Sequence, residues 1–211
     1  MKQIPVLLLL GLALSLCNLT SKLKGRGSNN NSNSGSSLSG TDTWAPAEKG
    51  TPTAAQTAAL AGGQEIKWDK QGISWTVPAK WSQTTNEDKS FMWRSPGGSE
   101  AANLIVTISA MDENFPTASS LKAFYDGAQT RSKNGEVDEV KWLEIDGVKG
   151  VEFREAKPSK DDDLRRLQWL TYRKFAGQVQ MINLMLSSSG KGFALHEDAM
   201  YGVMYSTKLV H

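Results

Sequence analysis

The densest group of potential metal ligands in the chain is a run of three aspartates: Asp161, Asp162 and Asp163. Carboxylate oxygens suit Ca²⁺, but an EF-hand loop alternates its ligands around a central glycine, and this run does neither. Lys160 and the pair Arg165-Arg166 flank the acids, so we expect local charge neutralisation in a solvated hairpin. No metal site is predicted, and the three aspartates remain a possible surface for a ligand or partner.

A second polar group, His196-Glu197-Asp198, could serve acid–base chemistry or bind a metal. Neighbouring positions on a helix point in different directions, so the three side chains do not converge. We interpret them as the acidic first turn of the last helix, which the helix dipole favours.

The sequence also gives little support for a catalytic nucleophile. The single cysteine, Cys17, lies near the N-terminus, and no serine occupies a Gly-x-Ser-x-Gly elbow. Gly190-Lys191-Gly192 lacks the remaining residues of a phosphate-binding loop. We therefore predict no catalytic residue, no cofactor and no enzymatic activity.

Tryptophans are unusually frequent. Exposed tryptophans could stack on glycans, but Trp75 shares an alternating face with Ile73 and Val77, as core residues do. Trp81 follows Pro78 in a connection, so we expect it at the edge of a groove. Most of the tryptophans after residue 63 are expected in the core: Trp68, Trp75, Trp93, Trp142 and Trp169.

The N-terminus has the composition of a signal peptide. Met1-Lys2 is a short positive segment, and the apolar stretch 4–14 is too short to cross a bilayer, which takes about 20 residues. Export is therefore predicted. One cysteine excludes an intrachain disulfide, so the folded part depends on packing alone.

The sequence Leu14-Ser15-Leu16-Cys17 resembles a bacterial lipobox, in which cleavage before the cysteine leaves a lipid-modified residue. Leu16 departs from the pattern, because a small residue normally precedes the cysteine. We favour residues 1–17 as the signal peptide of a lipoprotein that is lipidated on Cys17 and anchored in a bacterial envelope membrane. Ordinary cleavage with a soluble secreted or periplasmic product, or an uncleaved leader acting as an anchor, remain alternatives.

Residues 18–63 are rich in Ser, Asn, Gly and Ala, and the run 28–37 cannot bury enough apolar area to fold. They are predicted to be a disordered tether, with a helical turn or two at 54–61. The excess of basic residues lies in 1–63, which leaves 64–211 close to neutral. Nucleic acid is therefore not expected as a partner.

Residues 64–211 alternate between strand and helix patterns. Helices are predicted from Thr117 to about Gly135, where polar and apolar positions recur every three or four residues, and over 193–205. Asp146-Gly147 is a strong hairpin signal. Strands are predicted at 66–68, 73–77, 91–94, 104–108, 139–146, 148–156, 164–175 and 178–187. The order favours an α+β domain with a mainly antiparallel sheet and helices packed on both faces.

The segment Ile73-Ser74-Trp75-Thr76-Val77-Pro78-Ala79-Lys80-Trp81 resembles the opening of PsbP-like domains, and the strand at 103–109 and the closing helix fit as well. This superfamily takes its name from an extrinsic photosystem subunit and includes a Ran-binding import factor. The resemblance covers about residues 64–211 and implies an α/β/α sandwich that is mostly non-enzymatic.

From these observations we expect a membrane-tethered module that binds or stabilises an envelope protein. The photosynthetic and nuclear roles do not carry over, since no partner-binding residue matches by position. The alternative is a small-ligand or glycan binder that uses exposed tryptophans.

Overall fold

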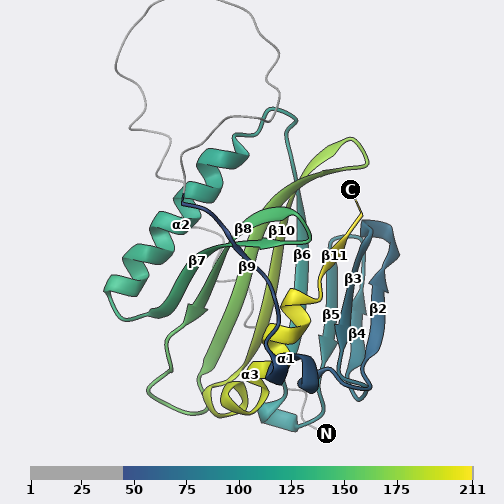
Figure 1. The fold of residues 1–211 in the computed structure, drawn as a ribbon, viewed down its shortest axis with the longest axis vertical. Coiled ribbons are helices and arrows are strands. Elements are labelled where there is room, and N and C mark those ends of the chain that lie inside the picture. Colours follow the sequence, from purple (N-terminus) through teal and green to yellow (C-terminus); the bar gives the residue numbers. More distant parts are fainter. Residues whose placement is uncertain (1–44, 211) are drawn as a thin grey trace, which may run out of the picture. The chain divides into compact units, whose positions relative to one another are not determined.

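An eight-stranded sheet forms the centre of the computed structural model, which describes residues 45–210 (Figure 1). The strand order is β1-β7-β8-β9-β10-β6-β5-β4, and every pair is antiparallel except β1 with β7. The strands are β1 (Glu48–Lys49), β4 (Ser82–Asn86), β5 (Ser90–Arg94), β6 (Asn103–Met111), β7 (Val137–Ile145), β8 (Val148–Glu155), β9 (Leu164–Phe175) and β10 (Gln178–Ser189).

A second sheet has three strands in the order β11-β3-β2. It pairs the C-terminal strand β11 with β3, which precedes the strands β4 to β10 in the sequence. On β3 the odd-numbered residues are buried, as their alternation predicted. Phe91 of β5 stacks between Trp68 and Trp75 of the small sheet, with ring centroids 5.5 and 5.3 Å away. The three strands are β2 (Gln64–Trp68), β3 (Ile73–Val77) and β11 (Lys208–Leu209).

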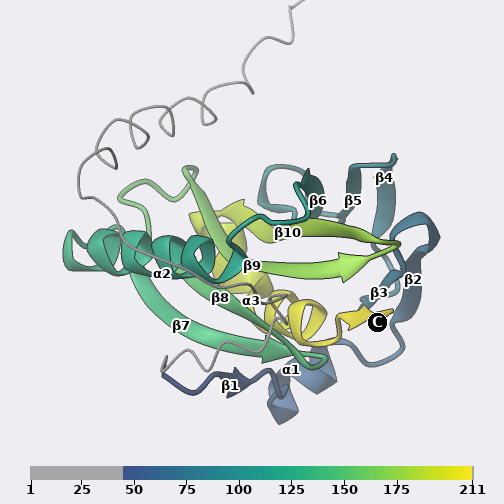
Figure 2. The same cartoon turned by 90° about the horizontal axis from the view of Figure 1, so that it is seen from above.

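Helices cover both faces of the large sheet (Figure 2). The helix α2 (Thr117–Lys133) packs on one face, where Leu121 and Ala128 contact the side chains of Trp142 and Phe153. The helix α3 (Gly190–Tyr205) packs on the other face with the small sheet. The predicted α+β architecture, with a mainly antiparallel sheet between helices, is confirmed.

Two hairpin turns have left-handed backbones. Asp146 and Gly147 have φ angles of 50° and 78° and join β7 to β8, as the Asp-Gly pair predicted. Ala176 and Gly177 have the same angles between β9 and β10, although alanine is an uncommon residue at positive φ.

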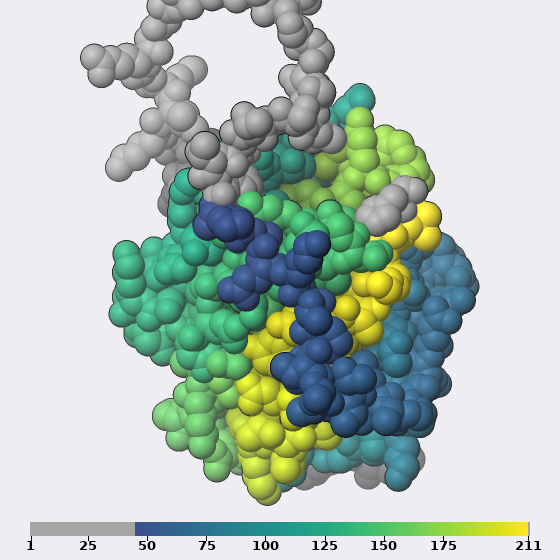
Figure 3. Space-filling view, in the orientation of Figure 1, coloured from purple at the N-terminus to yellow at the C-terminus, as the bar shows by residue number. Residues whose placement is uncertain are grey.

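The predicted end of the disordered tether at residue 63 is wrong. Residues 45–63 belong to the compact unit and include β1 and a short helix, α1 (Ala54–Ala59). Thr53 and Gln56 cap this helix reciprocally, which compensates for its lack of buried side chains. A Cβ atom on Gly202 would lie 2.8 Å from the carbonyl oxygen of Gln56, so α1 packs directly on α3 (Figure 3).

The last helix also differs from expectation, because it begins at Gly190 rather than at 193. Ser189 caps it by accepting a hydrogen bond from the Gly192 amide. The polar strand β4 and the short strands β1 and β11 were not predicted. Among the helices of residues 45–210, none combines the length and the apolar character needed to cross a bilayer.

Candidate functional site: a charged pocket between β7, β8 and α3

An irregularity near the start of β7 gathers charged side chains on one side of the sheet. Val137 pairs with Glu155 and Glu139 with Arg154, so Asp138 is an extra residue on β7. Such a bulge interrupts the strict alternation of side chains. Both Asp138 and Glu139 consequently reach the guanidinium of Arg154, at 2.7 and 3.4 Å.

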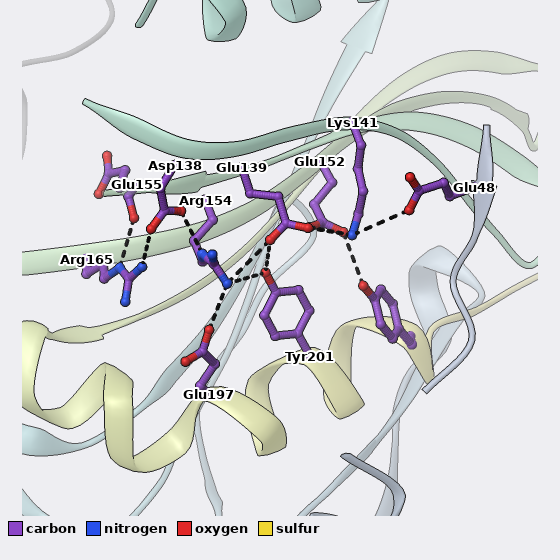
Figure 4. Close-up of polar contacts among 11 residues, drawn as sticks. Glu48, Asp138, Glu139, Lys141, Glu152, Arg154, Glu155, Arg165, Glu197 and Tyr201 are labelled. Atoms are coloured by element: carbon purple, nitrogen blue, oxygen red, sulfur yellow. Dashed lines mark hydrogen bonds and ion pairs between the residues drawn. The ribbon is translucent and has the colours of Figure 1, made fainter. Parts of the chain in front are cut away.

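Arg154 of β8 connects these acids to the last helix (Figure 4). Its Nη1 donates to Glu197 at 2.8 Å and to the hydroxyl of Tyr201 at 3.1 Å. Burial alone would lower the pKa of Arg154, but its hydrogen bond to Asp138 and the nearby negative charges raise it. Arg154 therefore keeps its charge and ties β7 to α3.

Lys141 occupies the centre of a second group of charges. Its Nζ lies 2.7 Å from Glu139, 3.4 Å from Glu152 and 3.9 Å from Glu48 of β1. Burial works to lower the pKa of Lys141, yet the hydrogen bond that it donates to Glu139 and the charge of Glu152 raise it overall. The contact with Glu48 also links the N-terminal segment to the sheet.

Glu152 is the most deeply buried acid of the group, with a side chain that is 0% exposed. Its Oε1 accepts no hydrogen bond, and its Oε2 accepts only a long one from Tyr205, at 3.5 Å. Burial is the main cause that raises the pKa of Glu152 to about 7; Lys141 opposes this and Glu139 adds to it. The group therefore changes charge near neutral pH.

The last helix presents one polar face to these strands. Glu197, Tyr201 and Tyr205 follow one another at four-residue intervals, so they lie on the same side of α3. Tyr201 donates a 2.7 Å hydrogen bond to Glu139. Burial and the neighbouring carboxylates raise the pKa of Tyr201, and they raise that of Tyr205 to about 12. Both hydroxyls remain protonated at neutral pH.

A surface pocket of about 300 Å³ opens above this network. Asp198 lies on its exposed rim and makes no ion pair or hydrogen bond within residues 45–210. Three acids and two bases line the pocket, which gives it a net negative charge. The lining residues are Gln56, Glu139, Lys141, Arg154, Glu197, Asp198, Tyr201 and Tyr205.

The chemistry of the pocket favours fixed charges over proton transfer. A general base must be unprotonated at the working pH, and it is most effective when its pKa lies near that pH. Lys141 and Arg154 have raised pKa values and stay protonated. Hydrogen bonds from Lys141 and Tyr201 outweigh the effect of burial and lower the pKa of Glu139. Glu152 titrates in a suitable range, but its side chain has no contact with solvent.

The predicted position of Trp81 at a groove edge is wrong. Its side chain is 5% exposed and belongs to the main core cluster, although Ala79 and Lys80 beside it are exposed. The expectation that most tryptophans are buried is confirmed, and only Trp93 of those after residue 63 is half-buried.

The three aspartates, Asp161, Asp162 and Asp163, lie exposed in the loop between β8 and β9. The carbonyl oxygens of Asp163 and Asp161 accept hydrogen bonds from the amides of Gly190 and Lys191, which fastens the loop to the start of α3. The predicted neutralisation by the neighbouring arginines is wrong. Asp161 instead forms a 3.9 Å ion pair with Lys157.

The arginines of this segment turn to β7 and β8. Arg165 pairs with Asp138 at 2.6 Å, and Arg166 pairs with Glu155 at 2.8 Å.

Cys17 lies outside the described residues. Within residues 45–210, no cluster of three or more His, Cys, Asp or Glu side chains is arranged to hold a metal ion.

The charged pocket itself was missed. The signal that could have revealed it is the two-residue spacing of Glu139 with Lys141 and of Glu152 with Arg154, which places charges on one face of two paired strands. The acidic group on the last helix was interpreted as its first turn, but α3 begins at Gly190. Glu197 therefore lies in the middle of the helix, opposite Arg154.

No protein-family model and no curated protein matches this sequence. Solved structures do. LpqN of Mycobacterium tuberculosis, which is involved in cell envelope biogenesis, aligns with a TM-score of 0.51 and 11% identity over 69% of this chain and 89% of LpqN.

Two more distant similarities have lower scores. Cyanobacterial PsbP (CyanoP) from Synechocystis sp. PCC 6803 gives a TM-score of 0.45 and 15% identity, over 70% of this chain and 92% of CyanoP. A protein from Bacteroides thetaiotaomicron gives 0.43 and 11% identity over 66% of this chain, and this chain covers 46% of its length. The folded domain therefore shares its α+β fold with LpqN.

Proposed function

We propose that this protein is an exported, lipid-anchored module of a bacterial envelope that binds a protein partner and carries out no reaction of its own. The observation that carries the proposal is the charged pocket, which holds permanent charges on a rigid frame of β7, β8 and α3. Fixed charges of both signs give specificity to a protein interface.

The frame of the pocket supports recognition because its side chains are held from several directions. Arg154 contacts Asp138, Glu139 and Glu197, and these acids come from two different elements. Side chains fixed by several partners lose little conformational entropy when a partner binds. The pocket is therefore preorganised for binding.

The envelope location rests on the N-terminus and on one similarity. The signal-peptide composition of residues 1–17 and the lipobox-like segment before Cys17 favour export and lipidation. LpqN shares the fold and is involved in cell envelope biogenesis, which supports the same compartment for this chain.

Glycan binding through exposed tryptophans is not proposed further. Five of the six tryptophans after residue 63 are at most 6% exposed, so they cannot offer a stacking platform. The aspartates Asp161, Asp162 and Asp163 remain a candidate secondary contact, because they are exposed beside the start of α3.

Two measurements test the proposal. Mass spectrometry of the mature protein is expected to find lipid on an N-terminal Cys17, and a Cys17→Ser variant is expected to leave the membrane fraction. Crosslinking in intact cells followed by purification is expected to recover one protein in stoichiometric amount. Unmodified Cys17 would overturn the anchor, and recovery of no protein under any growth condition would overturn the binding role.

A further inference from the structure

The face of the large sheet that carries α2 is covered over only part of its width. The helix contacts β7, β8 and β9, and Figure 2 shows no helix of residues 45–210 over β10, β6 and β5 on this side. On the opposite side, α3 and the small sheet bury β6 and β10 almost completely. We call the surface of β10, β6 and β5 on the side of α2 the open face.

Apolar side chains cross the middle of the open face. Met92 lies opposite Ile105, and Ile105 lies opposite Met185, so the three side chains form one row over β5, β6 and β10. All three are half-buried, as is Met181 on the same side of β10. Methionine adapts its shape to different partners and is frequent at binding surfaces.

The sequence of these strands is typical of cover on both sides. An antiparallel strand with one side in water alternates apolar and polar residues, whereas Leu104, Ile105 and Val106 are apolar without interruption. Ile105 and Met185 are the members that the chain leaves half exposed. Between Met181 and Met185, the amide oxygen of Asn183 accepts no hydrogen bond within residues 45–210, which is rare for a buried atom.

The open face has the width of one helix. Three neighbouring strands at about 4.8 Å span about 10 Å, close to the diameter of an α-helix. The hydroxyls of Ser120 on α2 and Tyr172 on β9 lie 2.8 Å apart, so this side of α2 faces the open strands. Phe124 follows Ser120 by four residues, is half-buried and forms the wall against which a second helix packs.

Charge determines which kind of helix fits. The strands β9, β10, β6, β5 and β4 contain no Asp or Glu, and their basic residues are Arg94, Arg165, Arg166, Arg173 and Lys174. By alternation, Arg94, Arg166 and Lys174 project on the side of α2. Arg166 is paired with Glu155, and Lys174 reaches only the exposed Glu113, at 3.9 Å. Arg94 donates to a backbone carbonyl and forms no ion pair within residues 45–210. Acidic residues therefore complement this surface.

We propose that the open face binds an amphipathic α-helix of another protein, with an apolar stripe over Met92, Ile105 and Met185 and acidic residues beside Arg94. The bound helix lies alongside α2 and buries the apolar row. The open face is on the opposite side of the sheet from the charged pocket, so its occupant makes no use of the pocket.

Methyl NMR of the full chain in lipid nanodiscs is the first test. The probes are two designed helical peptides of about 18 residues, or five turns, which share one leucine stripe and carry either glutamate or lysine beside it. The glutamate peptide is expected to give saturable shifts in the methyl signals of Met92, Met181 and Met185. The signals of Met200 and Met204, which are buried under α3, should not move. Equal binding of both peptides, or no shift on the open face, would overturn the proposal.

Matched variants separate the two features of the surface. Arg94→Glu is expected to weaken binding of the glutamate peptide at least about fivefold, the upper range for one exposed ion pair, and to favour the lysine peptide. Lys67→Glu, at an exposed cation of the small sheet, is the control and should change neither affinity. Unchanged affinities in Arg94→Glu would reject the acidic helix.

The apolar row is tested by Met185→Gln. Because Met185 is half exposed, the variant is expected to keep the unfolding midpoint of the native chain while it binds the glutamate peptide about tenfold more weakly. A lower midpoint with unchanged peptide affinity would place Met185 in the core and reject the open face as a binding surface.

Photo-crosslinking in cells identifies the natural occupant. A crosslinking amino acid at Thr107, in the open face beside Asn183, is expected to capture a segment of another protein with an apolar helical period flanked by Asp and Glu. A product with a second copy of this chain, with its own residues 18–44, or with no protein would overturn the proposal. Capture at Thr107 without capture at Gln56 keeps the open face and rejects the pocket; the reverse keeps the pocket and rejects the open face.

Discussion

The face of the large sheet that lies under α3 is apolar at one end of β7 and charged at the other. Leu143 and Ile145 join the main core, whereas Glu139 and Lys141, at the same two-residue spacing, form ion pairs. Both ends are covered by the same helix. Apolar packing stabilises the buried side chains at one end, and ion pairs stabilise those at the other.

This difference predicts different responses to solution conditions. Burial of apolar surface does not depend on protonation, so stability at the apolar end should not change with pH. Buried charges must remain paired, and their contribution depends on which groups are ionised. The two ends can therefore be separated by mutation and by pH.

The largest effect is expected in the main apolar core, to which the apolar end of β7 belongs. Phe91→Ala would open a cavity between Trp68 and Trp75, against which the ring stacks. We expect a loss of about 4 kcal/mol in the free energy of unfolding, equal at pH 5 and pH 8. Urea denaturation at both pH values measures this loss. A loss that changes strongly with pH would contradict the distinction between the apolar core and the charged end.

At the charged end, Lys141→Met would leave the fully buried Glu152 without its cation, whereas Glu139 would keep Arg154. We expect a loss of about 3 kcal/mol at pH 8 and a smaller loss at pH 5, where Glu152 is protonated. Lys67→Met, at an exposed ion pair, is the control and should cost under about 1 kcal/mol. Equal losses at both pH values would contradict a paired, buried charge.

Glu152→Gln tests the pH dependence directly. A carboxyl whose pKa rises from 4.5 to about 7 on folding holds its proton more tightly in the folded state. Its stabilising contribution is complete below about pH 4.5 and is lost as the pH rises through 7. We expect the native chain to lose about 3 kcal/mol more than the variant between pH 4.5 and 7.5. Parallel stability curves would disprove the shift.

The smallest effect concerns the segment that precedes the small sheet. Thr53→Ala removes the N-cap side chain of α1, whose hydroxyl oxygen accepts a hydrogen bond from the Gln56 amide. We expect a loss of about 1 kcal/mol, which shows that α1 belongs to the cooperative unit. Thr51→Ala is the nearby control and should have little effect. Equal free energies of unfolding in the two variants would indicate that α1 is part of the disordered tether.

The sequence predicted the elements that have a local apolar pattern and failed to predict those that lack one. Strands such as β3 were predictable because Ile73, Trp75 and Val77 alternate toward the core. The strand β4 was not, because Ser82–Asn86 has no apolar alternation and pairs only through its backbone with β5. In the N-terminal segment the helical turn at 54–61 was predicted, but its place in the compact unit was not, because that depends on contacts with α3 and β7, which are distant in sequence.

The pocket was hidden for a related reason. The pairing of Arg154 with Glu197 joins residues on β8 and α3, and no local pattern specifies it. The bulge that places Asp138 beside Glu139 depends on the register with β8. Trp81 was misplaced because a residue in a connection was expected to be accessible, whereas its side chain packs in the core between exposed neighbours.

The most direct test of the account is photo-crosslinking in living cells from a single position on the rim of the pocket. A crosslinking amino acid at Gln56, which lines the pocket, is expected to capture one protein, and the Asp198→Asn substitution is expected to reduce that capture. The same amino acid at Asp126, on the exposed side of α2, is expected to capture none of it. Absence of any product at position 56, or equal capture from both positions, would contradict a partner-binding pocket.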